Sequence, residues 1–368
     1  MKKIGIDGRL YSQTGVGTYL RNFIYELSRI KVTDLNFYIY VLPQDKEKII
    51  GLPAHFILRD APYRWHTMGE QIGFLKTIQK EDLDLMHFTY FGYPVFYRRK
   101  FIATVHDITP LLFKTGKAST KNSLLYLIKH FFFQHILRLQ IERAQFIMTP
   151  SNAVKEQIKK QFTLSEDNKI KTFYEGIGHE LMTVEENVSL SREFKEPFFI
   201  YVGNFYPHKN IERLIEAYSK VRTSTKLILI GPRDYFTSII SEHIQKFAMT
   251  KRIVIFDHAE AQDLVFFYKH AQALIHPSLS EGFGLPLIEA AYFNCPILAS
   301  DISVFKELLG SEYVSFDPYN PGDITESIEE FLKNPPEVRY EELLRKYSFK
   351  TMTEQTLSLY IEALKRRF

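Results

Sequence analysis

Short apolar runs alternate with longer amphipathic stretches along the whole chain. Most runs are apolar at every position rather than at every second one, which is typical of parallel strands covered on both faces. In the first half, the predicted strands are Lys3–Asp7, Phe37–Val41, His55–Leu58, Leu85–Phe88, Phe101–His106 and Phe146–Thr149. In the second half, they are Phe198–Val202, Lys226–Ile230, Arg252–Phe256, Ala273–His276 and Pro296–Ala299. The stretches between them predict helices, and therefore βαβ units in two doubly wound parallel α/β sheets.

A polar stretch at residues 182–197 separates the two series of strands and shows little apolar periodicity. We therefore predict an N-terminal Rossmann-like domain at residues 1–190 and a C-terminal one at residues 191–350. Residues 351–368 read as an amphipathic helix that packs back toward the N-terminal domain. Two such domains facing each other would leave a deep cleft at the carboxyl ends of both sheets, where ligands bind in this kind of fold.

Composition agrees with this architecture and narrows the setting. The 368 residues are 45% hydrophobic and 24% charged, which suits two globular domains and excludes a disordered or coiled-coil chain. The single cysteine, Cys295, excludes an intramolecular disulfide and favours a reducing compartment. The first residues lack the apolar core of a signal peptide. We expect a cytoplasmic protein in which Cys295 is buried packing.

The net charge of +4 is unevenly distributed, because residues 98–143 hold nine basic and two acidic residues. Within them, the apolar run of residues 123–138 is interrupted by four polar side chains, so it is no membrane span. One interpretation is a core helix of the N-terminal domain. The other is a helix on an anionic membrane surface at the inner face, with Lys114, Lys117 and Lys121 at head-group level. No nucleic-acid module accompanies the basic residues, so no nucleic acid is expected as a partner.

Two loops carry groups that suit phosphate. Gly15, Val16 and Gly17 follow the first strand and precede a helical pattern, so their backbone N–H groups can approach an anion. The spacing matches neither the dinucleotide-binding glycine motif nor the P-loop, and a tight turn without ligand is an equal alternative. Lys209 follows the strand Phe198–Val202 after Gly203 and Asn204, and a positive charge at a helix start suits a diphosphate. A solvated surface lysine is the alternative.

The stretch from His276 to Ala290 is the most informative one. A strand ends near His276, a glycine-rich loop follows, and Pro286 stands where the first turn of a helix should begin. Glu281 lies on the loop and Glu289 lies one turn into the helix. Between them, Phe283, Gly284 and Leu285 offer free backbone N–H groups. Ionised carboxylates accept strong hydrogen bonds from the hydroxyls of a sugar or a ribose.

In these motifs the chain resembles glycosyltransferase family 4, the retaining nucleotide-sugar transferases of the GT-B fold. The resemblance covers nearly the whole chain, through DGR and TGVGTYL, VHDITPLLF, TPSNAVK, YVGNFYPHKNIERLIEAY, LILIGP, SEGFGLPLIEA and ILASDISVFKEL. The spacing of seven residues between Glu281 and Glu289 is the signature of that family.

The resemblance implies a role for each matching residue. Glu289 would bind the ribose of the donor and Glu281 the donor sugar, while Phe283, Gly284 and Leu285 would hold oxygens of sugar and phosphate. Lys209 takes the position of the diphosphate-binding lysine, and Gly203 and Asn204 would also bind the donor. The loop of Gly15, Val16 and Gly17 would face Lys209 across the cleft. His106 aligns with the histidine beside the transferred sugar, with Asp107 next to it.

The chain departs from the family pattern at the diphosphate clamp. Many members have an arginine at the position of Asn204, and others have one at the position of His208. Arg233 is a candidate to complete the clamp. Base recognition is expected from Asp257–Gln262 and from the backbone near Ile230–Arg233.

The resemblance implies transfer of a hexose with retention of anomeric configuration and no cofactor besides the nucleotide-sugar. The first expectation for the donor is GDP-mannose, with UDP-hexoses close behind, and the acceptor is expected to be a glycan or a lipid-linked glycan. No metal is expected, because Asp82 and Asp84 precede a hydrophobic strand rather than end one, unlike the D-x-D motif of metal-dependent transferases. Two alternatives remain: a GT-B enzyme of another class, such as a nucleotide-sugar epimerase, and a non-catalytic nucleotide-sugar-binding subunit.

Overall fold

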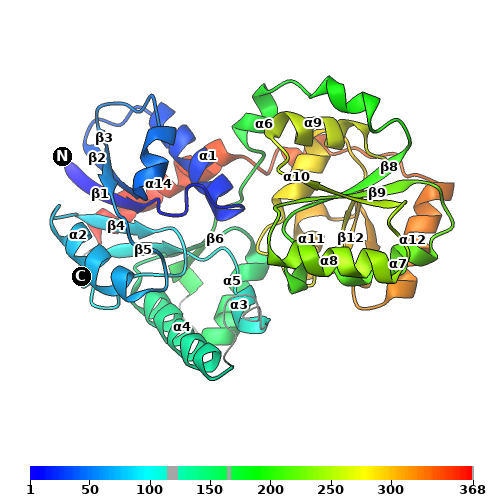
Figure 1. The fold of residues 1–368 in the computed structure, drawn as a ribbon. Coiled ribbons are helices and arrows are strands. Elements are labelled where there is room, and N and C mark those ends of the chain that lie inside the picture. The colour runs from blue at the N-terminus through cyan, green and yellow to red at the C-terminus, as the bar shows by residue number, and fades with distance from the viewer. Residues whose placement is uncertain (114–122, 164–166, 367–368) are drawn as a thin grey trace. The chain divides into compact units, whose positions relative to one another are not determined.

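The computed structural model describes residues 1–113, 123–163 and 167–366 (Figure 1). Their contacts divide them into two compact units. Unit 1 is formed by the described residues of Met1–Ile108, Asn122–Glu175 and Ser348–Phe368. Unit 2 is formed by those of Thr109–Lys121 and Gly176–Tyr347. The short segment that starts at Thr109 interrupts unit 1 in the sequence but belongs to unit 2. The C-terminal helix follows unit 2 in the sequence but belongs to unit 1.

Unit 1 is a parallel sheet with helices on its faces. Its strands are β1 (Lys2–Asp7), β2 (Leu35–Val41), β3 (Phe56–Asp60), β4 (Leu85–Phe88), β5 (Phe101–Thr104), β6 (Ile147–Thr149) and β7 (Ile170–Thr172). They lie in the order β3-β2-β1-β4-β5-β6-β7, and every pair is parallel. Its helices are α1 (Val16–Arg29), α2 (Leu75–Gln79), α4 (Ser123–Arg143), α5 (Asn152–Phe162) and α14 (Phe349–Lys365). Short turns of helix complete it: η1 (Pro43–Lys48), the π-helical η2 (Glu70–Phe74) and η4 (Asp167–Lys169).

Unit 2 repeats this plan with six parallel strands. They are β8 (Phe198–Val202), β9 (Lys226–Gly231), β10 (Ile253–Asp257), β11 (Leu274–His276), β12 (Ile297–Ser300) and β13 (Val314–Phe316), in the order β10-β9-β8-β11-β12-β13. Its helices are α3 (Thr109–Leu112), α6 (His179–Thr183), α7 (Ile211–Lys220), α8 (Tyr235–Lys246), α9 (Ala261–His270), α10 (Leu285–Tyr292), α11 (Ser303–Leu309), α12 (Pro321–Lys333) and α13 (Glu341–Leu344). Two 3-10 turns, η5 (Val188–Arg192) and η6 (Pro207–Lys209), complete the unit.

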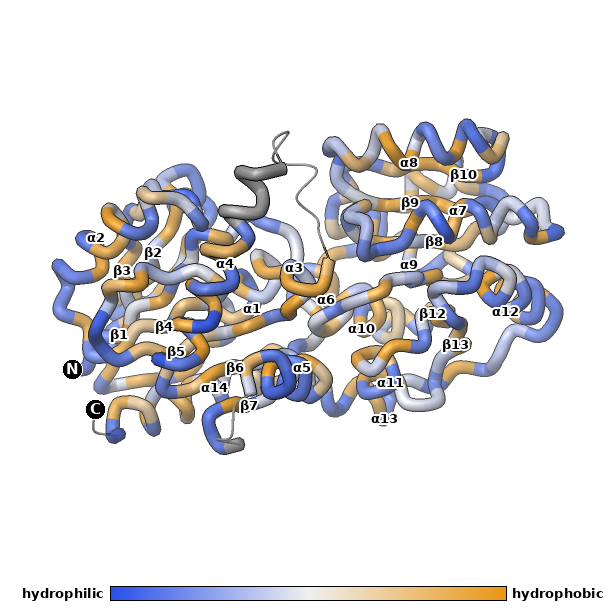
Figure 2. The backbone as a smooth tube through the Cα atoms, turned by 90° about the horizontal axis from the view of Figure 1, so that it is seen from below, coloured by the Kyte–Doolittle hydropathy of each residue, from blue (hydrophilic) through white to orange (hydrophobic). Residues whose placement is uncertain are grey.

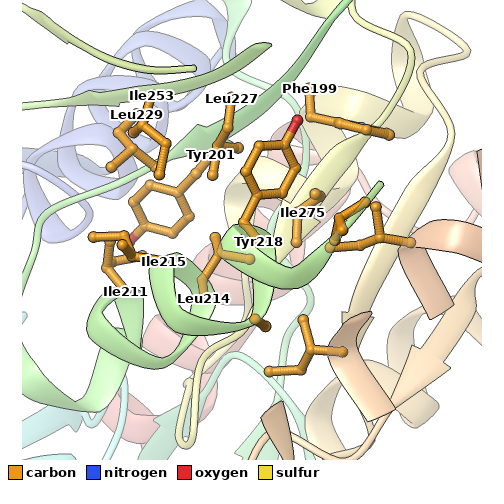
Figure 3. Close-up of a cluster of buried hydrophobic side chains, with 14 of the residues drawn as sticks. Phe199, Tyr201, Ile211, Leu214, Ile215, Tyr218, Leu227, Leu229, Ile253 and Ile275 are labelled. Atoms are coloured by element: carbon orange, nitrogen blue, oxygen red, sulfur yellow. The ribbon is translucent and has the colours of Figure 1, made fainter. Parts of the chain in front are cut away.

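The core of unit 2 shows why these sequences form layers (Figure 3). Alternate residues of the central strands point to one face of the sheet, as the period of two requires. Helix α7 meets that face with residues three and four apart, the spacing of one helical stripe. The two sets of side chains, all buried, are Phe199, Tyr201, Leu227 and Leu229 from the strands and Ile211, Leu214, Ile215 and Tyr218 from the helix. Helix α8 alternates between apolar and polar residues along its length, as a helix with one buried face does (Figure 2).

The structure confirms the predicted fold class of two doubly wound parallel sheets. All eleven predicted strands form, with ends that differ by at most two residues. Two further strands, β7 and β13, were not predicted. Each has three residues and includes a polar one, Lys171 or Ser315, so neither forms an apolar run that stands out in the sequence. The C-terminal amphipathic pattern forms α14, which begins two residues earlier than predicted.

Helix α4 combines features of both interpretations of its segment. Leu137 and Ile141 are fully buried, as in a core helix, whereas Phe131 and Phe132 are 66% and 58% exposed. The lysines at 114, 117 and 121 lie outside the described residues. Within the described part of the chain, no helix is both long and apolar enough to cross a lipid bilayer.

Candidate active site

In each of the two sheets, polar loops lie at the carboxyl ends of the strands near the middle of the strand order. The order reverses direction between β1 and β4 in unit 1 and between β8 and β11 in unit 2. In doubly wound folds, ligands bind at the carboxyl ends of the strands at this switch point. The predicted site residues of unit 2 follow β8 and β11, and those of unit 1 follow β1 and β5. Each group is described within its own unit.

Glu281 is the centre of a hydrogen-bonded cluster in unit 2. Three donors reach its oxygen Oε1: Nζ of Lys209 at 2.5 Å, Oγ of Ser278 at 2.8 Å and Nε2 of His276 at 3.0 Å. The other oxygen, Oε2, takes part in none of these bonds. The side chains of Lys209 and Glu281 are only 14% and 11% exposed. The cluster therefore holds a carboxylate in one orientation and leaves one of its oxygens for another partner.

The cluster also sets the charge of its members. Burial alone would raise the pKa of Glu281, but the positive charge of Lys209 and the hydrogen bond from His276 more than offset it, so this pKa lies well below its usual value. Burial lowers the pKa of His276, although Glu281 opposes the shift. Nδ1 of His276 is buried and has no partner among the described residues. His276 is therefore a neutral imidazole that donates from Nε2.

Sequence reasoning did not assign His276 and Ser278 to the site. His276 is buried, and its hydrogen-bond partner is the carboxylate of Glu281. The signal was present in the sequence, because a histidine that ends a strand at the switch point lies at the edge where ligands bind.

Lys209 is held in place by the residue that follows it. Asn210 has a left-handed backbone, with φ of 63°, and links η6 to α7. Its amide Nδ2 donates to the carbonyl oxygens of Pro277 at 3.0 Å and Pro318 at 2.8 Å. Asn210 is itself buried. One side chain thus joins the loops that follow β8, β11 and β13.

The loop between β8 and Lys209 is a turn without a charged side chain. Gly203 has φ of 148°, and a Cβ atom there would lie 2.8 Å from the Oη of Tyr201, so the position requires glycine. Asn204 accepts from the Tyr201 hydroxyl through its carbonyl oxygen at 2.6 Å. Burial, assisted by the charge of Lys209, lowers the pKa of His208 to about 4, so His208 adds no positive charge. Arg233 is 76% exposed and lies 3.6 Å from Asp257.

Glu289 lies in a different environment from Glu281. It is buried on α10, and Oη of Tyr268 donates to its Oε2 at 2.7 Å. Burial raises the pKa of Glu289 to about 7, and the bond from Tyr268 opposes this only in part. Glu289 therefore changes protonation near neutral pH, while Glu281 stays ionised.

The loop between the two glutamates ends at a helix N-terminus without a side-chain cap. Gly284 is the N-cap of α10, with φ of 103°, and Pro286 stands in the first turn. A Cβ atom on Gly284 would lie 3.1 Å from Leu287 and Phe305, so the backbone there is closely packed. Phe283 is buried and contacts Tyr347 edge-on. The N–H groups at this end of α10 are available to an anion or a hydroxyl.

The loop of Gly15, Val16 and Gly17 also leads into an uncapped helix. Gly15 is the N-cap of α1, with φ of 63° and no side-chain cap. A Cβ atom on Gly17 would lie 2.7 Å from the carbonyl oxygen of Tyr11, so the close approach of two backbone segments requires this glycine. The first turn of α1 contains no acidic residue, which leaves its positive end open to an anion.

His106 follows β5 in unit 1 and is buried beside Glu175. No sequence argument singled out Glu175. Nε2 of His106 lies 3.0 Å from the carbonyl oxygen of Thr89, and Nδ1 lies 3.3 Å from Oε1 of Glu175. Asp107 is half-buried beside it. Two residues further along the chain, the Thr109 hydroxyl lies 3.0 Å from that of Ser280, within unit 2. A segment that the sequence did not suggest therefore contacts the loop that carries Glu281.

The aspartates of the D-x-D pattern serve as ion-pair partners. Asp84 accepts from Lys2 at 2.7 Å and from the backbone of Lys3, and Asp82 pairs with Arg99. Among the residues that the structure describes, no group of three or more His, Cys, Asp or Glu side chains is placed to hold a metal ion. Cys295 is buried as expected.

Comparison with known proteins gives these sites a context. Two family models match: Glycosyltransferase Family 4 over residues 14–181 and Glycosyl transferases group 1 over residues 185–350. The O-antigen chain mannosyltransferase RfbU of Salmonella typhimurium is 26% identical over 252 residues, which are 68% of this chain and 66% of that protein. O-antigen chain mannosyltransferase B of Escherichia coli is 24% identical over 70% of this chain and 69% of its own length. The chain thus spans about two thirds of the length of these relatives.

Solved structures share the fold over nearly the whole chain. Sucrose-phosphate synthase from Thermosynechococcus elongatus has a TM-score of 0.78 and 16% identity, covering 98% of this chain and 99% of its own. Anabaena Alr3699/HepE, solved in complex with UDP and glucose, has a TM-score of 0.75 and 13% identity, covering 98% and 100%. The two parallel-sheet domains thus have the GT-B fold. More narrowly, the chain belongs to glycosyltransferase family 4.

Proposed function

We propose that this protein transfers a hexose, with mannose as the first candidate, from a nucleotide-sugar to a hydroxyl of a glycan or lipid-linked glycan. GDP-mannose is the first candidate donor, and UDP-hexoses are the second. The observation that carries the proposal is the Glu281 cluster with Lys209, which lies at the switch point of the unit 2 sheet beside the uncapped N-terminus of α10. The two O-antigen mannosyltransferases among the relatives support a mannosyl donor and a polysaccharide acceptor.

In this proposal the site binds the donor in three parts. Glu289 accepts hydrogen bonds from the ribose hydroxyls, and the N–H groups of Phe283, Gly284 and Leu285 hold oxygens of the sugar and the phosphate. Lys209 neutralises the diphosphate, and the free Oε2 of Glu281 accepts from a sugar hydroxyl. These interactions need a carboxylate that is already oriented, and the three donors to Oε1 supply that orientation.

The proposed reaction exchanges one bond at the anomeric carbon for another. The bond to the diphosphate oxygen breaks, and the electron pair leaves with the nucleoside diphosphate while positive charge develops on the sugar ring. The acceptor oxygen bonds to the same face and releases its proton to an oxygen of the leaving diphosphate, which retains the configuration. The task of the protein is to stabilise charge on the leaving group and to orient the reactants, which Lys209, the Gly15–Gly17 loop and the helix N-termini can do. We propose that His106 and Asp107 lie beside the sugar.

The deciding experiment is a thermal-shift panel with GDP, UDP, ADP, dTDP and CDP on wild type, Glu289→Gln and Glu326→Gln. A ligand that binds the folded state raises its melting temperature, so one nucleotide should stabilise wild type. Glu289→Gln should weaken that shift, whereas Glu326→Gln, an exposed position on α12, should preserve it. No shift with any nucleotide would contradict the proposal and favour a non-catalytic subunit.

Turnover separates the transferase from the other alternative. Incubation of the identified nucleotide-sugar without acceptor should leave its sugar unchanged in NMR spectra, apart from slow hydrolysis. Conversion to an isomeric nucleotide-sugar would instead indicate an epimerase. We further propose that transfer needs no metal ion; activity that a chelator abolishes and Mg²⁺ or Mn²⁺ restores would contradict this part.

We also propose that α4 attaches the protein to an anionic membrane surface. The exposed rings of Phe131 and Phe132, on a helix whose Leu137 and Ile141 are buried, support this. Aromatic side chains enter the lipid interface, and basic residues add attraction to anionic head groups. In flotation assays at low salt, wild type should rise with phosphatidylglycerol vesicles, and a Phe131→Ser, Phe132→Ser double variant should rise far less. Equal flotation with neutral phosphatidylcholine vesicles, or none with either, would contradict the proposal.

A further inference from the structure

Glu175 is a buried carboxylate that neither the motifs nor the proposed donor site explains. It follows β7 at the carboxyl edge of the unit 1 sheet, and its side chain is 6% exposed. Its Oε1 lies 3.3 Å from Nδ1 of His106, whose side chain is 10% exposed. A carboxylate this deeply buried destabilises the fold unless a partner compensates its charge. His106 is the partner.

The surroundings of His106 decide which of its ring nitrogens carry protons. Nε2 lies 3.0 Å from the carbonyl oxygen of Thr89. A carbonyl oxygen can only accept, so Nε2 must carry a proton. Thr89 cannot turn away, because its own hydroxyl donates to the carbonyl oxygen of Asp7. Nδ1 faces a carboxylate, and a proton between the two groups gives an imidazolium paired with Glu175.

The other groups around the ring do not compete for this proton. Tyr19 of α1 meets the ring edge-on at 4.7 Å, and burial, together with the charge of Glu175, keeps the pKa of Tyr19 above its usual value. His87 of β4 is neutral, because burial, assisted by the charge of His106, lowers its pKa to about 3. Both His87 nitrogens already have partners, the hydroxyls of Tyr360 and Thr104 at 2.7 Å.

We propose that Glu175 is a positioning residue for His106, which it holds as an imidazolium with both ring nitrogens engaged. The inference rests on the proposed function for its meaning, since His106 is proposed to lie beside the transferred sugar. A ring in this state has no lone pair with which to accept a proton from the acceptor hydroxyl. Its contribution is a fixed shape and a polarised C–H surface beside the sugar. The carboxylate of Glu175 cancels the charge of the ring, so the pair does not oppose positive charge that develops on the sugar.

The first test reads the ring directly. In protein labelled with ¹⁵N-histidine, proton–nitrogen correlation spectra distinguish protonated ring nitrogens from bare ones, and His106→Asn identifies the His106 signals among those of the twelve histidines. Wild type should show both His106 nitrogens protonated at neutral pH. In Glu175→Gln, Nε2 should keep its proton and Nδ1 should lose it, because an amide can donate to a neutral ring. Glu156→Gln, an exposed glutamate of α5 in the same unit, is the matched control and should change nothing.

The second test asks whether the ring state matters for turnover. With the donor that the nucleotide panel identifies, Glu175→Gln should lower kcat on the order of 100-fold, the cost of a small misplacement at a reacting centre, and leave nucleotide affinity unchanged. Glu175→Asp, which keeps the charge, should recover part of that loss. Unchanged kcat in Glu175→Gln would overturn the role in transfer.

The two tests also separate this inference from the proposed function. A bare His106 nitrogen in wild type, or a spectrum that Glu175→Gln leaves unchanged, overturns the inference even if nucleotides bind. If no nucleotide binds, the proposed function fails, and the ring spectra still decide whether Glu175 holds His106. Melting curves of each variant show that it is folded before either test.

Discussion

At the scale of single residues, Glu281 and Glu289 show how environment divides two like side chains. Both are in one loop and helix of unit 2, and burial penalises the charge of both. Glu281 has Lys209 and two further donors on one oxygen, which keep it ionised. Glu289 has one neutral donor, Tyr268, so its pKa rises to about 7. One glutamate is therefore a permanent charge and the other titrates in the range where the protein would work.

The raised pKa of Glu289 predicts pH-dependent nucleotide binding. If ribose hydroxyls donate to Glu289, the ionised form binds better, so affinity should increase as pH rises through 7. For a group with a pKa of about 7, the gain between pH 6 and pH 8 should be roughly tenfold. Titration calorimetry at pH 6, 7 and 8 measures it. A pH-independent affinity in wild type would contradict the prediction, and Glu289→Gln should show weak binding at every pH.

The same pKa predicts a stability cost at high pH. The folded-state pKa of about 7 lies above the ordinary 4.5, so folded protein holds an extra proton between these values. Stability therefore falls as pH rises across that window, and the cost is complete above pH 7. Glu289→Gln removes this cost. Between pH 5 and pH 8, its free energy of unfolding should therefore increase by up to about 3 kcal/mol relative to that of wild type. Urea unfolding at both pH values measures the gain, and the Glu326→Gln control should show none.

At the scale of elements, the site depends on loops that are tied together at the ends of strands. Asn210 is the clearest tie, because its amide joins the loops after β8, β11 and β13. Its left-handed backbone also sets the direction in which α7 leaves η6. Lys209 precedes it directly, so the position of the ammonium group depends on this turn.

Substitution of Asn210 should therefore affect both stability and the site. Asn210→Gly keeps the left-handed backbone but removes the amide donor to the carbonyl oxygen of Pro277 and leaves Arg213 as the remaining donor to that of Pro318, at a cost of about 1 to 3 kcal/mol. Nucleotide affinity should fall with it, because Lys209 loses its fixed position. Chemical unfolding and calorimetry measure the two effects. Asp234→Ala, which removes the N-cap of α8 away from this tie, should cost about 1 kcal/mol and leave affinity unchanged. Equal affinity in Asn210→Gly would contradict the argument.

At the scale of the whole molecule, the chain returns to unit 1 after completing unit 2. Helix α14 packs against α1, and Oη of Tyr360 lies 2.7 Å from Nδ1 of His87 in the unit 1 core. Lys100 donates to the carbonyl oxygens at the end of the helix, at Leu364 and Arg366. Unit 1 therefore includes segments from both ends of the sequence.

A chain that ends at Tyr347 should consequently lose unit 1 rather than unit 2. It would expose the faces against which Phe349, Met352, Leu359 and Tyr360 are buried, and each such side chain contributes about 1.5 to 3 kcal/mol. Hydrogen exchange should show loss of protection in β1, β4 and β5 and retained protection in β8 and β11. A chain that ends at Lys365 keeps the helix and serves as the control. Native protection of β4 in the shorter chain would contradict this prediction.

The sequence by itself determined the two sheets and the residues at their edges. Continuous apolar runs predicted parallel strands that are buried on both faces. Local motifs placed Lys209, Glu281 and Glu289 at the ends of strands and helices. The strands β7 and β13 gave no such signal, because each includes at least one polar residue and forms no continuous apolar run.

Only the tertiary structure decided which side chains meet. Glu281 and His276 are close in sequence, but Lys209 is 72 residues away, and His106 meets Glu175 from another strand end. Such pairs arise when strands far apart in the chain become neighbours, and no local pattern records that. The protonation states follow for the same reason: burial and nearby charge set a pKa, and both are properties of the folded chain.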